Sequence, residues 1–191
     1  MKNLSRCGVF TIAVSSFLAG CTHMATNKLE ATNGTGAIAI PISIVTNSES
    51  KKYPCRSLEL AIKKTFVDPS DLNEGIKEEI YVGKKPTYSL ITNLAPGDYS
   101  VGEYRCYANY RRVFNDSKSY LTSYAGLSFE VKADQVLILK KGFEGSVDYD
   151  AVGGSSFNYG FYSATGGQKE SIKETMTNQG LPAGWTIVEQ Q

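Results

Sequence analysis

A strict alternation of isoleucines constrains the fold of this chain more than any other feature. Ile38, Ile40, Ile42 and Ile44 occupy every second position, so a β-strand directs all four side chains to one face. Pro41 lies on the opposite face and has no backbone N–H, which predicts an edge position or a strand beginning. The segment therefore predicts a strand with one apolar face.

The same period of two recurs along the rest of the chain. Leu58, Leu60, Ile62 and Phe66 alternate, although a helix over residues 57–67 is the competing interpretation. About eight short, regularly spaced strands favour an all-β fold, a single immunoglobulin- or prealbumin-like β-sandwich of about seven to eight strands. The other candidate strands lie at residues 80–82, 88–90, 99–108, 127–131, 136–139, 147–149 and 157–161.

Two turns and one irregularity can be located in this pattern. In Ala95-Pro96-Gly97-Asp98, Pro suits the second turn position and Gly can take the positive φ that a type II turn needs at the third. We expect this turn to link two strands, and the Ala133-Asp134-Gln135 corner to reverse the chain again. The apolar register shifts near Gly102, which predicts a β-bulge there.

One short C-terminal helix is predicted. Ser171 and Glu174 have the spacing of a capping box, and Ile172 and Met176 lie four residues apart. Gly180 with Pro182 provides a stop. Beyond it, Trp185, Ile187 and Val188 are expected to return to the sheet.

The N-terminal segment resembles the signal peptide of bacterial lipoproteins. Lys2 and Arg6 precede an apolar run over residues 7–18, which is shorter than the roughly 20 residues that span a bilayer. Leu18-Ala19-Gly20-Cys21 resembles the lipobox at all four positions. The resemblance implies cleavage before Cys21, a diacylglycerol on its thiol and acylation of the new amino group. An ordinary signal peptide or a signal anchor is the alternative.

This resemblance also implies a location and a domain organisation. Because Thr22 stands where Asp would imply retention in the inner membrane, we expect an outer-membrane lipoprotein facing the periplasm. Residues 1–20 are the predicted signal peptide, residues 21–36 the lipidated N-terminus and a flexible polar linker, and residues 37–191 the β-sandwich domain. His23, the one histidine, lies in this linker.

Two cysteines remain for the folded domain. Cys55 and Cys106 form an even pair in an exported chain, which predicts a disulfide. Two free buried thiols are the alternative. A metal site is not expected, because structural zinc needs four N or S ligands.

A second resemblance concerns the turn. Leu94 to Val101 is similar to the L-x-P-G-x-Y-x-V pattern of prealbumin-like and carboxypeptidase-regulatory-like β-sandwich domains, and residues 129–139 resemble the strand-turn-strand that often follows it in envelope lipoproteins. Asp134 stands where that pattern favours Gly. Such a resemblance implies a fold and never a reaction.

Tyrosine and arginine gather in one stretch. Rings of this kind at partly exposed positions suit recognition of a protein or a glycan, because they offer apolar area with a polar tip. A strand buries only alternate residues, so some of these rings must face solvent. The expected recognition surface comprises Tyr104, Tyr107, Tyr110, Arg111, Arg112 and Tyr120.

Composition narrows the function classes. The 20 basic and 19 acidic residues leave no polybasic excess for nucleic acid. With its histidine in the linker, the chain shows no catalytic triad, and we expect no cofactor and no enzyme. The leading hypothesis is a lipid-anchored, non-catalytic binding or assembly module with an envelope protein or glycan as partner. A scaffold subunit of an envelope or secretion machine and an enzyme without a recognisable motif are the alternatives.

Overall fold

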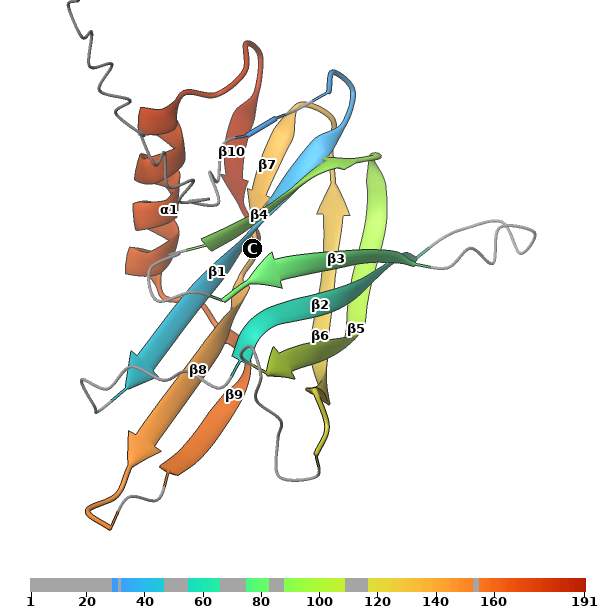
Figure 1. Ribbon diagram of the computed structural model, residues 1–191. Helices are drawn as coiled ribbons and strands as arrows, with labels where there is room; N and C mark the ends of the chain where they lie inside the picture. Colours follow the sequence, from blue (N-terminus) through green and yellow to red (C-terminus); the bar gives the residue numbers. More distant parts are fainter. Residues whose placement is uncertain are drawn as a thin grey trace, which may run out of the picture.

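The computed structural model describes residues 29–30, 32–46, 55–65, 75–82, 88–108, 117–152 and 155–191. Within these ranges the chain forms ten strands and one helix (Figure 1). No helix in this part of the chain has the length and apolarity to cross a bilayer. The elements are β1 Gly36–Thr46, β2 Cys55–Lys64, β3 Ile76–Tyr81, β4 Tyr88–Leu94, β5 Gly97–Ala108, β6 Tyr120–Val131, β7 Gln135–Ile138, β8 Lys141–Tyr149, β9 Ser155–Ser163, α1 Gly166–Gln179 and β10 Thr186–Glu189.

The strands form two sheets, and the larger one is mixed. Its order is β10-β7-β1-β8-β9, with β4 also paired to β1. β1 runs parallel to both β7 and β8, and β10 runs parallel to β7. The predicted mostly-β fold with a C-terminal helix is confirmed. The immunoglobulin- or prealbumin-like arrangement is wrong, because that sandwich consists of antiparallel sheets.

The position of Pro41 also differs from the prediction. β1 is a central strand, and Pro41 lies in its interior rather than at an edge or a beginning. Residues 37–39 of β1 pair with β7, whereas residues 42–46 pair with β8. Pro41 therefore lies where β1 changes neighbours on that side. A missing N–H disturbs the ladder least at such a break.

The smaller sheet is antiparallel, in the order β3-β2-β5-β6. Its register shifts between Val101 and Glu103 of β5, which confirms the bulge predicted at Gly102. Opposite this shift, Gly126 of β6 has a φ of +59°. A bulge bends a strand and increases its twist, and the strands of this sheet curve strongly in Figure 1.

The chain turns at residues 95–98 as predicted and passes there from one sheet to the other, but the turn is not of type II, which has a φ of about +80° at its third position. Gly97 has a φ of +146°, a region that L side chains rarely adopt. β4 before the turn pairs with β1, whereas β5 after it belongs to the smaller sheet. The Tyr99 hydroxyl donates a hydrogen bond to the Ala95 carbonyl oxygen at 2.7 Å. This bond closes the turn from within the core.

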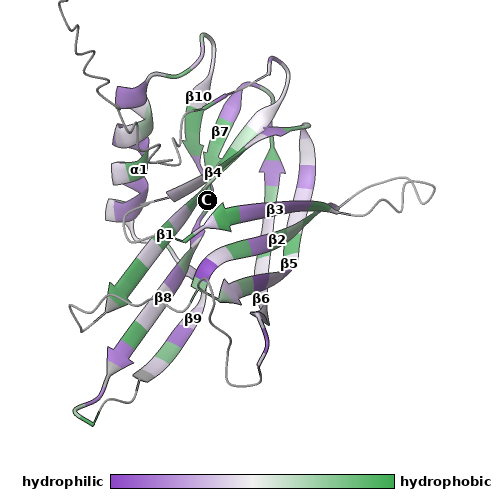
Figure 2. Ribbon diagram, in the orientation of Figure 1, coloured by the Kyte–Doolittle hydropathy of each residue, from purple (hydrophilic) through white to green (hydrophobic). Residues whose placement is uncertain are grey.

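The main core lies between the sheets and contains the side chains that the alternation predicted. Ile38, Ile40 and Ile42 are buried, and Ile44 packs against the cluster. Hydrophobic and hydrophilic residues alternate along β2, β8 and β9 in Figure 2. From the smaller sheet, the inward residues of β2, β5 and β6 complete this core.

A second cluster lies on the other face of β1. Ala37 and Ala39 pack there with Ile172 and Met176 of α1 and with Trp185. The helix thus covers the second face of β1 at Ala37 and Ala39, so the first half of this strand is buried on both sides. Ile172 and Met176 are buried as expected, but the predicted helix start is wrong. α1 begins after Thr165, whose side chain accepts from the Gln168 N–H in a capping box.

The chain is already held in place before β1. Leu29 packs against the second cluster. The Thr32 N–H donates to Asn93 Oδ1 at 3.0 Å, and the Gly34 N–H donates to Asp134 Oδ1 at 3.2 Å. The last residues of the expected flexible linker are therefore part of the folded domain.

The outer edge of β6 carries side-chain hydrogen bonds. Gln190 Nε2 donates to the Ser128 carbonyl oxygen at 2.6 Å, and Lys141 Nζ donates to the Gly126 carbonyl oxygen at 3.4 Å. β6 is the last strand of its sheet, so these groups occupy positions at which a further strand would pair.

Candidate functional site

The outer face of the smaller sheet carries a row of tyrosines. Residues directly opposite each other in paired strands point to the same face. Ser57 of β2 lies opposite both Tyr81 of β3 and Tyr107 of β5, and Tyr107 lies opposite Tyr120 of β6. The register of four strands thus places three rings in one line across the sheet.

A second line of side chains runs beside this row. Glu59 of β2 lies opposite Arg105 of β5, which lies opposite Thr122 of β6, and Tyr124 lies one line further along, opposite Glu103. The side chains of these lines face away from the main core, because their strand neighbours Leu58, Tyr104 and Cys106 belong to it. We call this surface the tyrosine face and define it as Glu59, Tyr81, Arg105, Tyr107, Tyr120 and Tyr124.

The centre of the tyrosine face is held by mutual contacts. The rings of Tyr107 and Tyr120 lie 5.5 Å apart. The Arg105 guanidinium lies 5.0 Å from the centroid of the Tyr120 ring, within cation–π range. Glu59 accepts a hydrogen bond from the Tyr107 hydroxyl at 3.2 Å and another from Arg105 at 3.4 Å. These contacts fix the ring orientations before any partner arrives.

The protonation states of this centre are defined. The hydrogen bond with Tyr107, followed by the ring of Tyr120 and the carboxylate of Glu59, raises the pKa of Arg105. Burial raises the pKa of Tyr107 above its usual value. At neutral pH Arg105 is therefore a cation, paired with the Glu59 carboxylate, and the Tyr107 hydroxyl keeps its proton.

Three rings of the face are exposed. The exposed fraction is 58% for Tyr81, 36% for Tyr120 and 76% for Tyr124. These are the most solvent-accessible large rings on this sheet, and the area that they offer is not used by the fold itself.

The structure assigns the expected recognition residues to different places. Tyr107 and Tyr120 lie on the tyrosine face. Tyr104 is a correction, because it is buried in the main core, where its ring lies 5.1 Å from that of Phe161 in an edge-on contact. Tyr104 and Tyr107 are three residues apart in a part of β5 without a bulge, so their side chains point to opposite faces, and that of Tyr104 points inward. Tyr110, Arg111 and Arg112 lie outside the described residues, as do Cys21 and His23.

Four residues of the face were not among the expected ones: Glu59, Tyr81, Arg105 and Tyr124. Arg105 and Tyr124 stand inside the tyrosine-rich stretch, and their alternation with Tyr104 and Ala125 is the signal that marks them as outward. Tyr81 lies far from that stretch in the sequence. It joins the face only through the pairing of β3 with β2, which no local pattern reveals.

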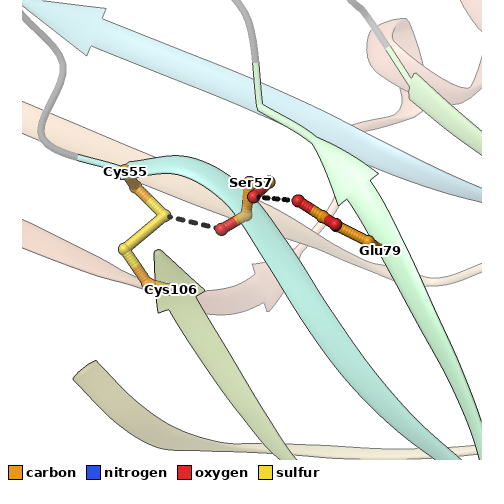
Figure 3. The surroundings of a disulfide bond; sticks show 4 residues. All are labelled: Cys55, Ser57, Glu79 and Cys106. Atoms are coloured by element: carbon orange, nitrogen blue, oxygen red, sulfur yellow. Dashed lines mark hydrogen bonds between the residues drawn. A yellow bond between two sulfur atoms is a disulfide. The ribbon is translucent and has the colours of Figure 1, made fainter. Parts of the chain in front are cut away.

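The predicted disulfide is confirmed, and it lies behind this surface (Figure 3). Cys55 of β2 and Cys106 of β5 are both buried and their Cα atoms lie 5.5 Å apart. Next to the disulfide, the Ser57 hydroxyl donates to Glu79 Oε1 at 2.6 Å, and Arg56 contacts the same carboxylate at 3.6 Å. The disulfide thus links two of the strands that carry the tyrosine face.

A hollow of about 370 Å³ lies elsewhere, beside the start of α1. Its three lysines all have partners: Lys169 pairs with Glu189 at 2.8 Å, and Lys140 and Lys141 donate to carbonyl oxygens. Within the described ranges, no three His, Cys, Asp or Glu side chains gather to hold a metal ion. The tyrosine face is therefore the stronger candidate site.

Comparison with known proteins adds no relative: no family model, curated protein or solved structure matches the chain.

Proposed function

We propose that this protein is a lipid-anchored, non-catalytic binding module of the bacterial envelope that holds a protein partner on its tyrosine face. The observation that supports it is the composition of the face. Tyrosine and arginine are the side chains most enriched at the centres of protein–protein interfaces, and here they are exposed, clustered and already ordered by Glu59. The lipobox resemblance at Cys21 supports the anchor.

The arrangement favours a protein over a glycan as the occupant. The rings of Tyr107 and Tyr120 are inclined by 51°, so they do not form the flat platform on which a sugar ring stacks. One side of the Tyr120 ring is already covered by Arg105. Because Arg105 already pairs with Glu59 and Glu103, the partner surface that fits is one that supplies apolar groups to the rings and hydrogen-bonding groups to their hydroxyls.

Site-specific photocrosslinking in cells tests the binding face. A photoreactive phenylalanine analogue replaces Tyr81, Tyr120 or Tyr124 in turn. The matched control is the same replacement of Tyr162 on β9, a ring that is 52% exposed but belongs to the other sheet. We expect protease-sensitive crosslinked products from the face positions and none from position 162. Products that form equally at all four positions, or only products that resist protease, contradict a protein partner on this face.

Mass spectrometry of membrane-extracted protein tests the anchor. We expect the mature chain to begin at Cys21 and to carry added acyl mass, because two or more chains are needed for stable anchoring. The Cys21→Ser variant should remain unprocessed and lack this mass. A mature chain that begins elsewhere contradicts the anchor.

A further inference from the structure

The point at which the N-terminal segment joins the domain is fixed. Two residues with left-handed backbone, Asn93 at a φ of 60° and Asp134 at 55°, present the side-chain oxygens that accept the Thr32 and Gly34 N–H groups. Asp134 also donates its own N–H to the Thr35 carbonyl oxygen at 2.8 Å. With Leu29 packed in the second cluster, the chain is attached from Leu29 onward at the end where β1 begins.

The remaining tether is short. Eight residue steps separate Cys21 from Leu29. Fully extended, they reach at most about 28 Å.

The domain is longer than this tether. From Ala37 to Thr46, β1 alone extends about 30 Å at a rise of ~3.3 Å per residue. β8 continues beyond Val147, the partner of Thr46, into the hairpin with β9. Figure 1 shows the start of β1 and this hairpin at opposite ends of the molecule. Val152, near the hairpin tip, is 93% exposed.

We propose that the anchored domain stands on the bilayer in one orientation only. The end that carries the β4–β5 and β6–β7 turns faces the lipid, and the β8–β9 hairpin points away from it. An inverted domain would place Leu29 farther from the lipid than the tether reaches. The inference rests on the lipid anchor of the proposed function and deepens it.

The orientation also limits how a partner approaches. Tyr107 lies ten residues along β5 from Gly97, which stands at the lipid-facing turn, and Tyr120 lies at the start of β6, far from Val131 at that turn. The tyrosine row thus lies toward the end of the sheet remote from the bilayer. Its partner is a protein that reaches it from the aqueous side rather than one embedded in the same membrane.

The single tryptophan makes this orientation measurable. Trp185 packs in the same cluster as Leu29, and the Thr186 N–H that follows it donates to the Asp134 carbonyl oxygen at 3.1 Å. It therefore reports on the lipid-facing end. The chain from Cys21 onward is coupled through the Cys21 thiol to a maleimide-headgroup lipid in phosphatidylcholine vesicles that contain a dansyl-headgroup lipid. Cys55 and Cys106 do not react, because they form the disulfide.

We expect strong energy transfer from Trp185 to the dansyl lipids. The comparison is the double variant Trp185→Phe/Val152→Trp, which moves the indole to the hairpin tip. Transfer from position 152 should be several-fold weaker. The indole nitrogen of Trp185 has no hydrogen-bond partner, so phenylalanine removes none, and circular dichroism checks the fold. Equal or stronger transfer from position 152 overturns the proposal.

Lengthening the tether provides a second, independent measurement in the wild-type background. A Gly/Ser insertion after Lys28 that triples the tether should lower the transfer from Trp185, and unchanged transfer contradicts a tether-imposed orientation. The chemical coupling needs no lipoprotein processing. Failure of native acylation would therefore refute the proposed anchor, whereas failure of the transfer measurement would refute the orientation alone.

Discussion

Asp134 shows how one residue fixes both a turn and the entry of the chain. Its φ of +55° is a conformation that costs an L residue about 1 kcal/mol, although Asp tolerates it better than most. Glycine, which the similar turn pattern favours here, would remove that cost but also the carboxylate that accepts the Gly34 N–H. Asp at this position therefore retains a strained backbone conformation but gains a hydrogen bond with the N-terminal segment.

Substitutions at this position separate the two effects. We expect Asp134→Ala to lower the free energy of unfolding by about 1–3 kcal/mol, since it loses the hydrogen bond and retains the backbone strain. Asp134→Gly should cost about 1 kcal/mol less than Asp134→Ala. Urea unfolding of the three proteins measures this, and equal losses for Ala and Gly would argue against strain at this position.

Tyr104 is the buried phenol of the main core. Its hydroxyl is buried without a hydrogen-bond partner, and burial raises its pKa above the usual value near 10. A group with a raised pKa in the folded state contributes stability below its unfolded pKa and loses it as the pH rises through the folded pKa. Ionisation of Tyr104 therefore favours unfolding in alkaline solution.

Tyr104→Phe is expected to leave the free energy of unfolding at pH 7 within about 1 kcal/mol of the wild type, because the hydroxyl that it removes makes no hydrogen bond of good geometry. Above pH 10 the variant should lose less stability than the wild type. Chemical unfolding at pH 7 and at alkaline pH measures both. The exposed Tyr124→Phe serves as control and should follow the wild type at each pH. If Tyr104→Phe loses as much stability at alkaline pH as the wild type, other titrating groups cause that loss.

At the scale of elements, local patterns predicted what depends on neighbours in sequence. The isoleucine alternation located β1, the register shift located the bulge at Gly102, and the Pro96-Gly97 turn was correctly placed. The predicted helix start was wrong because Thr165 and Gln168 form the capping box, six residues before Ser171 and Glu174, which have the same spacing.

Pairing between distant segments was not predictable in this way. Nothing in residues 36–46 shows that β7 and β8 lie beside them in parallel, or that α1 covers Ala37 and Ala39. The same reason explains Tyr81, which reaches the tyrosine face only through β2. Parallel neighbours are chosen by the global packing of β1 on both faces, and that information is spread over the whole chain.

The disulfide links β2 to β5, the two central strands of the smaller sheet. It closes a sequence separation of 51 residues, for which chain entropy predicts a stabilisation of up to about 4 kcal/mol. We expect Cys55→Ala/Cys106→Ala to lower the urea midpoint accordingly and to reduce crosslinking at Tyr120. A reduced wild-type protein provides the matched control and should behave alike. Wild-type stability in both would contradict a structural role of the bond.

At the scale of the molecule, β1 unites the two clusters. Gly142 of β8 lies so close to this strand that an added Cβ would meet the Pro41 carbonyl oxygen at 2.5 Å. We expect Gly142→Ala to cost about 1–3 kcal/mol by overpacking. Because β1 belongs to both clusters, Trp185 fluorescence and far-ultraviolet circular dichroism should shift to the same lower midpoint.

The control for this substitution is Gly167→Ala. An added Cβ has open space at that position in α1, so the exchange should be neutral or stabilise by up to about 1 kcal/mol. Separate midpoints for the two probes in Gly142→Ala would show that the clusters unfold independently.

The side-chain caps on β6 have a consequence for many copies on one membrane. Copies anchored and oriented as proposed above would diffuse in two dimensions and meet in the same orientation, so an open strand edge on each would favour edge-to-edge polymerisation. Gln190 and Lys141 already occupy the Ser128 and Gly126 carbonyls, and β3 at the opposite edge carries Lys77, Glu78 and Glu79. Both edges of the smaller sheet thus carry groups that oppose pairing with a strand from a second copy.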